Sequence, residues 1–340
     1  MSVNLNTSNT ITGLVNSGFR PAWWLPGPHA QTLWPFLFRP RQLPEVTWER
    51  LELPDGDFLD LAWHGSGPDI CVLLHGLEGC YRSHYMPGMM QTLAMAGWRV
   101  VVIHFRGCSG EVNRLPRSYH SGETGDLRHV LRRLREREQP RRLAAVGFSL
   151  GGNVLLKHLG ERPWVSDLDA ACAVSVPFDL AAGAERLSQG LSQLYQWWLV
   201  RALRRKMAAK FSRMPSPIDL SALNQHRTFR EFDDKVTAPL HDFIDADDYY
   251  ARSSSKRFLI AITTPTLILQ AADDPFLGPE PVPTADELSS AVRFELSQRG
   301  GHVGFVSGHW PWQAEYWLDG RVRVFLTEQS MRHNERLAVN

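Results

Sequence analysis

The chain has 340 residues, of which 43% are apolar and 21% charged, and these values are typical of a folded globular protein. Lysine and arginine total 37 against 36 aspartate and glutamate residues, so the formal net charge is only +1. This balance excludes the strongly basic surface of a dedicated nucleic-acid-binding protein.

The polar start of the chain and the cysteine pattern predict a cytoplasmic protein. Residues 1–20 contain no basic stretch followed by an apolar one, so no signal peptide is expected. No apolar run approaches the roughly 18 residues that a membrane-spanning helix needs. The four cysteines form neither a CxxC pair nor a zinc-binding spacing, and scattered cysteines suit a reducing compartment.

The N-terminal part of the chain predicts an arm followed by a β-hairpin. Residues 1–20 are expected to form a loose tail, and residues 21–40, rich in Pro and Trp, an irregular arm packed over the body. The partly alternating runs 46–53 and 58–64 flank an Asp-Gly turn, which predicts two antiparallel strands.

From residue 70 onward, short apolar runs alternate with helical stretches. Continuous apolar strands separated by helices are typical of a mostly parallel sheet covered on both faces. Between about 178 and 255 the pattern becomes helical, which predicts a cap over the sheet edge. We therefore predict an arm (1–40) and one α/β domain (41–340) that includes this cap. Strands are predicted at 70–75, 99–105, 143–148, 168–176, 264–271 and 291–297, and helices at about 84–96 and 123–137.

The segment GFSLGG (147–152) joins a predicted strand directly to a predicted helix. At such a turn the central residue adopts a strained backbone conformation that exposes its side chain, and small neighbours let the backbone pack closely. A plain helix N-cap is the alternative interpretation of Ser149, whereas a dinucleotide loop would need the order G-x-G-x-x-G, which is absent. The strand before Ser149 and the helix after it favour a nucleophile.

A serine nucleophile needs a general base, and the base needs an acid that orients it. On this architecture the chain order is Ser, then Asp or Glu, then His. Asp274 follows the predicted strand 264–271, and His302 lies in a glycine-flanked loop after the next strand. We predict that Ser149, Asp274 and His302 are catalytic. The less favoured candidates for acid and base are Asp273, Asp179 and His309.

The developing oxyanion of such a reaction needs two preorganised N–H donors. The backbone N–H of Leu150, directly after the nucleophile, is one candidate. The backbone N–H of Leu77, in the loop LLHGLEG (73–79), is the other. His75 in the same loop is expected to be a structural hydrogen-bonding residue.

These motifs resemble the α/β-hydrolase superfamily and, more narrowly, its YheT-like branch of esterases. The similarity extends over about residues 20–325, and the combination of HFRGCSG (104–110) with YHSGET (119–124) is its most specific part. The resemblance implies a twisted, mostly parallel sheet with helices on both faces and a helical cap. It also implies a serine carboxylesterase for short- to medium-chain acyl esters. Where the branch usually has His-Leu-Gln-Thr, this chain has the accessory segment His29-Ala30-Gln31-Thr32. The motifs that carry the resemblance are LLHGLEG, HFRGCSGEVNRLPRSYHSGETGDL, VGFSLGGN, DDPF and GGHVGF.

Lipase, phospholipase or thioesterase activity would use the same triad, and a non-catalytic binding protein with a hydrolase fold is the alternative outside enzymes. The expected partner is a small acyl ester. Neither a cofactor nor a metal is implied, no nucleic acid and no membrane span are expected, and transient contact with a lipid surface is a further hypothesis.

Other polar and aromatic residues are interpreted as structural. His104 and Arg106 would tie loops together, Arg106 by bidentate hydrogen bonds. The acidic segment 231–250 lacks the ligand spacing of a hard-cation site. For Trp197 and Trp198, on a basic amphipathic stretch, packing of the cap onto the sheet is favoured over an acyl-binding entrance or contact with a membrane surface.

Overall fold

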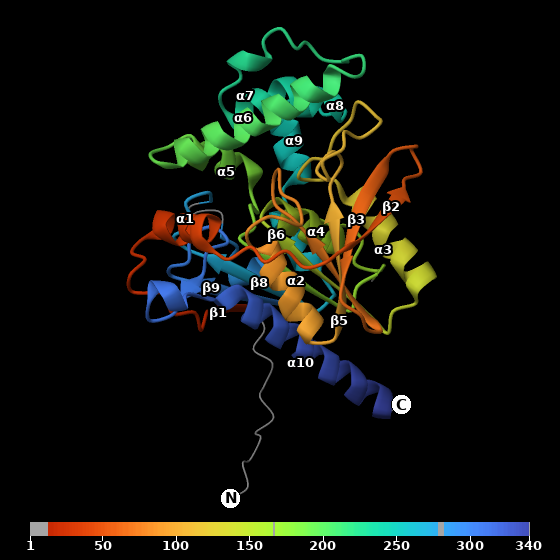
Figure 1. Ribbon diagram of the computed structural model, residues 1–340, viewed down its shortest axis with the longest axis vertical. Helices are drawn as coiled ribbons and strands as arrows, with labels where there is room; N and C mark the ends of the chain where they lie inside the picture. The colour runs from red at the N-terminus through yellow and green to blue at the C-terminus, as the bar shows by residue number, and fades with distance from the viewer. Residues whose placement is uncertain (1–12, 166, 278–281, 340) are drawn as a thin grey trace, which may run out of the picture.

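The computed structural model describes residues 13–165, 167–277 and 282–339, with side chains up to residue 331. Within these residues a nine-stranded sheet carries helices on both faces, and a further helical layer stands above one end of the sheet (Figure 1). The strands lie in the order β1 (Gly13–Asn16), β9 (Val292–Ser297), β8 (Thr266–Ala271), β7 (Ala170–Val174), β6 (Arg142–Phe148), β4 (Asp69–Leu74), β5 (Trp98–His104), β3 (Phe58–His64) and β2 (Thr47–Glu52).

Neighbouring strands from β1 to β5 pair in parallel, whereas β3 runs antiparallel to both β5 and β2. This arrangement confirms the predicted mostly parallel sheet and the hairpin around the turn at 54–57. A parallel sheet is covered on both faces, which explains the nearly continuous apolar sequence of its strands.

The central strand β4 shows how the two faces of the sheet are filled. Ile70, Val72 and Leu74 point into a core shared with α3 (Thr124–Glu138) and α4 (Leu150–Glu161). Cys71 and Leu73 point into the opposite core, shared with α2 (Met86–Met95) and α10 (Trp317–Val339). Because successive side chains of a strand alternate between faces, one short apolar run supplies both cores.

The residues between β7 and β8 form a helical insertion above the carboxyl ends of the strands (Figure 1). Its apolar side chains, among them Leu203, Phe232 and Tyr250, form a cluster separate from the two sheet cores. The insertion contains α5 (Leu180–Leu187), α6 (Ser192–Phe211), η1 (Leu223–Gln225), α7 (Phe229–Phe232), the π-helical turn η2 (Asp233–Thr237), α8 (Ala238–Leu240) and α9 (Ala246–Ser253). The short elements elsewhere are η3 (Lys256–Ala261), η4 (Ala285–Glu287), β10 (Val306–Ser307), η5 (Pro311–Gln313) and β11 (Glu315–Tyr316).

The prediction of a loose tail over residues 1–20 is wrong for its described part, while residues 1–12 lie outside the described residues. Strand β1 pairs in parallel with β9 at the edge of the sheet. Phe19 is buried, and its ring centroid lies 5.1 Å from that of Phe305 and 5.5 Å from that of Trp317. Pairing with a strand distant in sequence orders this segment, and no local pattern indicates such pairing.

The prediction of an irregular arm over residues 21–40 is also wrong in part, because helix α1 (Pro28–Phe38) forms there. Pro28 stands at the first helical position, where no intrahelical N–H bond is lost. The side chain of Gln31 donates to the carbonyl of Val306 at 3.1 Å and accepts from its N–H at 2.8 Å. Pro35 in the interior of α1 would weaken the helix in isolation, and this tertiary contact stabilises it.

Candidate active site

Ser149 lies at the joint between β6 and α4, in the conformation that the sequence predicts. Its backbone has φ 51° and ψ −120°, a left-handed φ that L-residues rarely adopt. The turn is tightly packed, since a Cβ on Gly151 would lie 2.6 Å from the carbonyl oxygens of Leu74 and His75. Glycine at this position therefore lets the strand enter the helix sharply and holds the half-buried Ser149 at the carboxyl end of the sheet.

Ser149, His302 and Asp274 come together from three separate loops. The Ser149 Oγ lies 3.0 Å from His302 Nε2, and His302 Nδ1 lies 2.9 Å from Asp274 Oδ2. Asp274 is 1% exposed and His302 8% exposed, so their contact is shielded from water. The Phe276 ring stacks on the imidazole at 4.0 Å between centroids, and the N–H of His302 donates to Thr32 Oγ1 at 2.9 Å.

The alternative acids and base occupy other positions. Asp273 accepts a 3.0 Å bond from the N–H of Gly301, which steadies the loop before His302. Burial, and secondarily the neighbouring carboxylate, raise the pKa of Asp273. Asp179 caps the N-terminus of α5, and His309 is exposed in the turn before η5. None of the three contacts Ser149 or His302 through its side chain in the described part of the chain.

The loop after β4 holds the N–H of Leu77 between two anchored neighbours. Gly76 donates its N–H to Tyr85 Oη and Glu78 donates its N–H to Tyr119 Oη, each at 2.8 Å. Glu78 has a left-handed φ of 54°. Among the described residues no acceptor bonds the N–H of Leu77, and Leu150, at the first position of α4, has no intrahelical acceptor.

His75 has the structural role that the sequence predicts. Its Nδ1–H donates to the carbonyl of Gly76 at 2.7 Å, and its Nε2 accepts from the N–H of Phe105 at 3.2 Å. Burial above all, with His104 nearby, lowers the pKa of His75 to about 3. The imidazole is therefore neutral and fixed, and it shapes the loop.

Arg106 also has its predicted structural role. Its guanidinium binds Asp126 in a bidentate manner, at 2.7 and 2.6 Å, and reaches Asp57 at 2.9 Å. This buried network joins the loop after β5 to the hairpin turn and to α3.

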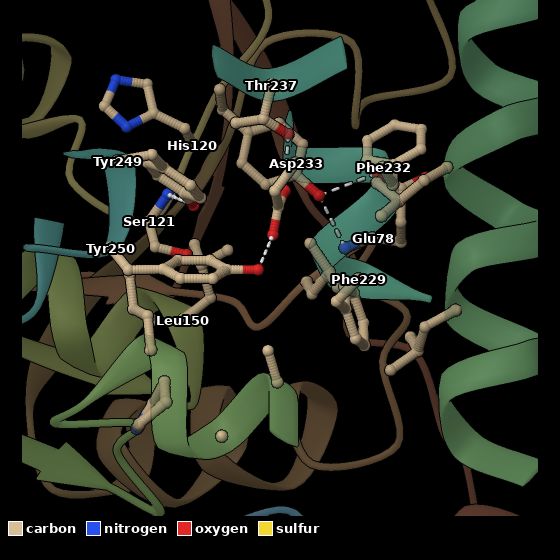
Figure 2. A pocket seen from close by; sticks show the side chains of 18 of the residues that line it. Glu78, His120, Ser121, Leu150, Phe229, Phe232, Asp233, Thr237, Tyr249 and Tyr250 are labelled. Carbon is tan, nitrogen blue, oxygen red and sulfur yellow. Dashed lines mark hydrogen bonds between the residues drawn. The ribbon is translucent and has the colours of Figure 1, made fainter. Parts of the chain in front are cut away.

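A cavity of about 140 Å³ extends from Ser149 into the space under the insertion. One wall is apolar and includes Leu199, Leu203 and Phe229. The other wall carries two carboxyl groups, those of Glu78 and Asp233 (Figure 2).

Hydroxyl and ammonium groups of the insertion surround these carboxyl groups. Asp233 accepts from Thr237 Oγ1 at 2.6 Å and from Tyr250 Oη at 2.8 Å, as Figure 2 shows. Burial raises the pKa of Asp233 to about 6. Glu78 pairs at 2.6 Å with Nζ of Lys206 from α6.

The sequence did not identify Lys206 or Tyr250 as cavity residues. Lys206 belongs to a basic helical run and reaches Glu78 across 128 positions of the chain. Such a contact leaves no local pattern that would reveal it. Among the described residues no group of three or more His, Cys, Asp or Glu side chains could hold a metal ion.

Comparison with known proteins shows the family of the chain. The sequence profile of the alpha/beta hydrolase fold matches residues 70–308. The chain belongs to this family. This hydrolase is 42% identical over 306 residues to "Putative esterase YheT" of Escherichia coli (strain K12), a match that covers 88% of the chain and 90% of the relative.

A more distant relative and a solved structure of the same fold each match most of the chain. It is 30% identical over 342 residues to "Phospholipase ABHD3" of Mus musculus, covering 96% of the chain and 82% of the relative. The solved esterase Pf2001 of Pyrococcus furiosus shares its fold, with a TM-score of 0.56 at 17% identity, over 96% of the chain and all of that structure (100%). The chain is therefore an α/β-hydrolase.

The described helices include none with both the length and the apolar character needed to cross a membrane.

Proposed function

We propose that this α/β-hydrolase is a serine carboxylic ester hydrolase with Ser149, His302 and Asp274 as its catalytic triad. The observation that carries the proposal is the continuous contact from Ser149 Oγ through the His302 imidazole to Asp274, at 3.0 and 2.9 Å. A hydroxyl this close to an imidazole nitrogen has its general base within hydrogen-bond reach.

In the acylation step, Ser149 Oγ attacks the ester carbonyl carbon while His302 Nε2 takes the hydroxyl proton. The C=O π bond breaks, and its oxygen becomes an oxyanion that the N–H groups of Leu150 and Leu77 stabilise. His302 then gives its proton to the alkoxide oxygen as the C–O bond breaks, and the alcohol leaves. Asp274 holds the imidazole in the required tautomer and stabilises the imidazolium.

Deacylation repeats these roles with water as the nucleophile. His302 takes a proton from the water as the water oxygen bonds to the acyl carbon and the C=O π bond opens to an oxyanion. The carbonyl then re-forms, the bond between the acyl carbon and Ser149 Oγ breaks, and His302 gives the proton to Ser149 Oγ. The products are a carboxylic acid and the free enzyme. Apart from the ester and the water, every group that these two steps require belongs to the chain itself.

The apolar wall of the cavity supports an acyl chain as the group bound beside Ser149. Leu199, Leu203 and Phe229 offer hydrocarbon surface, which an aliphatic chain covers with a gain from the hydrophobic effect. The insertion encloses this space from above, which favours short- to medium-chain acyl groups.

The test is hydrolysis of p-nitrophenyl esters from acetate to laurate by the wild type, Ser149→Ala and the control Ser330→Ala. Ser330 lies on α10, where its hydroxyl donates to the carbonyl of Leu326. We expect Ser149→Ala to lose activity by a factor of at least about 10³ and to lose labelling by a fluorophosphonate probe, since no nucleophile remains. Ser330→Ala should behave like the wild type. A wild type that neither hydrolyses the esters nor reacts with the probe would contradict the proposal and favour a non-catalytic binding protein.

Phospholipase activity is the second candidate, favoured by the 30% identity to a protein named as a phospholipase. A short-chain phosphatidylcholine offered to the same variants separates the two candidates. Faster turnover of this lipid than of the p-nitrophenyl esters, lost in Ser149→Ala, would establish a phospholipase with the same triad. A matched acyl thioester tests thioesterase activity in the same way.

A further inference from the structure

An exposed apolar surface joins α1 to the N-terminal half of α6, and we call it the aromatic face. Trp197 is 57% exposed, Trp198 53% and Leu37 61%, although packing onto the sheet was the favoured prediction for the two tryptophans. The rings of Phe36 and Trp198 meet across the two helices at 5.9 Å between centroids. Single exposed apolar residues are common, but a continuous group of them indicates a binding surface. The aromatic face consists of Leu33, Phe36, Leu37, Leu194, Trp197 and Trp198.

The charge of these two helices is strongly asymmetric. Neither α1 nor α6 contains an aspartate or glutamate, although the whole chain has 36 of them among 340 residues. The Arg41 guanidinium lies 5.5 Å from the Phe36 ring centroid, and that of Arg201 lies 5.1 Å from Trp197. Two exposed arginines therefore border the aromatic face, Arg41 just after the end of α1 and Arg201 on α6, which makes it complementary to an anionic surface.

The aromatic face lies beside the entrance to the candidate active site. Tyr195, from the same helical turns as Trp197, bonds His29 of α1 at 3.0 Å. The Tyr195 ring contacts Phe276 at 4.9 Å, and Phe276 stacks on His302. The opposite side of α6 lines the cavity through Leu199 and Leu203. Figure 1 shows α1 just below the start of α6.

We propose that the aromatic face docks on an anionic phospholipid surface, with α1 and the N-terminal half of α6 lying in the lipid–water interface. Trp197, Trp198 and Leu37 enter the boundary between headgroups and acyl chains. Arg41 and Arg201 reach the phosphate groups, because long basic side chains bury their stems and keep their charge at the headgroup level. Docking brings the entrance of the cavity to the lipid phase, and it does not depend on the chemistry of Ser149.

The experiment is sedimentation of the full chain with vesicles of phosphatidylcholine mixed with phosphatidylglycerol, and with vesicles of phosphatidylcholine alone. We expect binding to the mixed vesicles to be the tighter, and to weaken as salt is raised, because salt screens exposed charges. Trp197→Ser and Leu37→Ser should each weaken binding roughly tenfold, because each removes a large apolar side chain from the interface.

The matched control is Trp164→Ser. Trp164 is 79% exposed and follows the C-terminal end of α4, which runs from Ser149 back toward the amino ends of the parallel strands β6 and β7. This variant should bind vesicles like the wild type. All three variants should keep the wild-type far-ultraviolet circular dichroism, which separates loss of docking from loss of folding.

Three outcomes would overturn the proposal. The first is a wild type that binds neither kind of vesicle, and the second is an equal loss of binding in Trp164→Ser. The third is a wild type that elutes as a dimer and that Trp197→Ser converts to a monomer, since a second copy would then cover the aromatic face. Ester hydrolysis is measured separately, so failure of docking leaves the proposed function intact, and the reverse also holds.

Discussion

Asp273 and Asp274 are adjacent in sequence, but their side chains have different partners. Only Asp274 contacts His302, whereas Asp273 accepts from the N–H of Gly301. We expect Asp274→Asn to lower kcat on p-nitrophenyl butyrate on the order of 10⁴-fold, because the amide stabilises the wrong imidazole tautomer. Asp273→Asn keeps an oxygen for Gly301 and should lose less than about tenfold. Equal losses in the two variants, or a larger loss in Asp273→Asn, would mean that Asp274 is not the acid.

The raised pKa of Asp233 predicts that the stability of the protein depends on pH. Its pKa of about 6 in the folded protein exceeds the ordinary 3.8, so the folded state binds the proton more tightly than the unfolded state. Its contribution to stability is therefore present below about pH 4 and is lost as the pH rises through about 6. The Asp233→Asn variant has no titrating carboxyl group at this position and does not lose this stability. Its free energy of unfolding relative to the wild type should therefore rise by about 2–3 kcal/mol between about pH 4 and pH 8.

Urea unfolding of both proteins across this pH range measures the difference. Asp234→Asn is the control, because the pKa of Asp234 is lowered, chiefly by a hydrogen bond from Lys235, and its relative stability should not rise with pH. A difference between Asp233→Asn and the wild type that is independent of pH would mean that Asp233 does not titrate in this range.

At the scale of elements, α6 and the loop after β4 are joined by one ion pair. Lys206 Nζ lies 2.6 Å from Glu78 Oε1, and Glu78 follows Leu77 directly. Lys206→Met leaves the Glu78 carboxylate without its cation, and the backbone N–H of Leu77 should lose its fixed direction. We expect kcat to fall roughly tenfold with a smaller change in KM, since the N–H acts mainly in the transition state.

Lys206→Arg should restore part of the activity, because it retains the charge. Lys157→Met is the control, since it breaks a comparable, partly buried 2.8 Å pair with Glu161 on α4. A rise in KM at constant kcat in Lys206→Met would instead assign Lys206 to substrate binding.

At the scale of the whole molecule, the N-terminal segment and the C-terminal part of the chain pack together in one of the two cores of the sheet. Phe19 packs against both Phe305 and Trp317, although almost the whole chain separates them in sequence. Phe19→Ala should lower the free energy of unfolding by about 3–5 kcal/mol, measured by urea denaturation. Leu14, 44% exposed on β1, provides the control, and Leu14→Ala should cost under about 1 kcal/mol. Equal effects would mean that Phe19 is not part of the cooperative core.

Local patterns predicted the elements that depend on local interactions. The alternation in β4, the Asp-Gly hairpin turn and the glycine-rich turn around Ser149 each reflect sterics or side-chain periodicity within a few residues. Elements decided by distant partners were missed. The bonds between Gln31 and Val306 hold α1, pairing with β9 orders β1, and neither feature leaves a signal in its own segment.

The sequence by itself determined the hairpin at 46–64, the alternation of strands and helices from residue 70 onward, the sharp turn at Ser149 and the short set of residues from which acid and base could come. Only the tertiary structure decided that Asp274 rather than Asp273 faces His302, that Lys206 reaches the loop of Leu77, and that Trp197 and Trp198 are exposed. The physical reason is one of range. Backbone sterics and periodicity act between neighbours in the chain, whereas hydrogen-bond partners and burial depend on segments that only folding brings together.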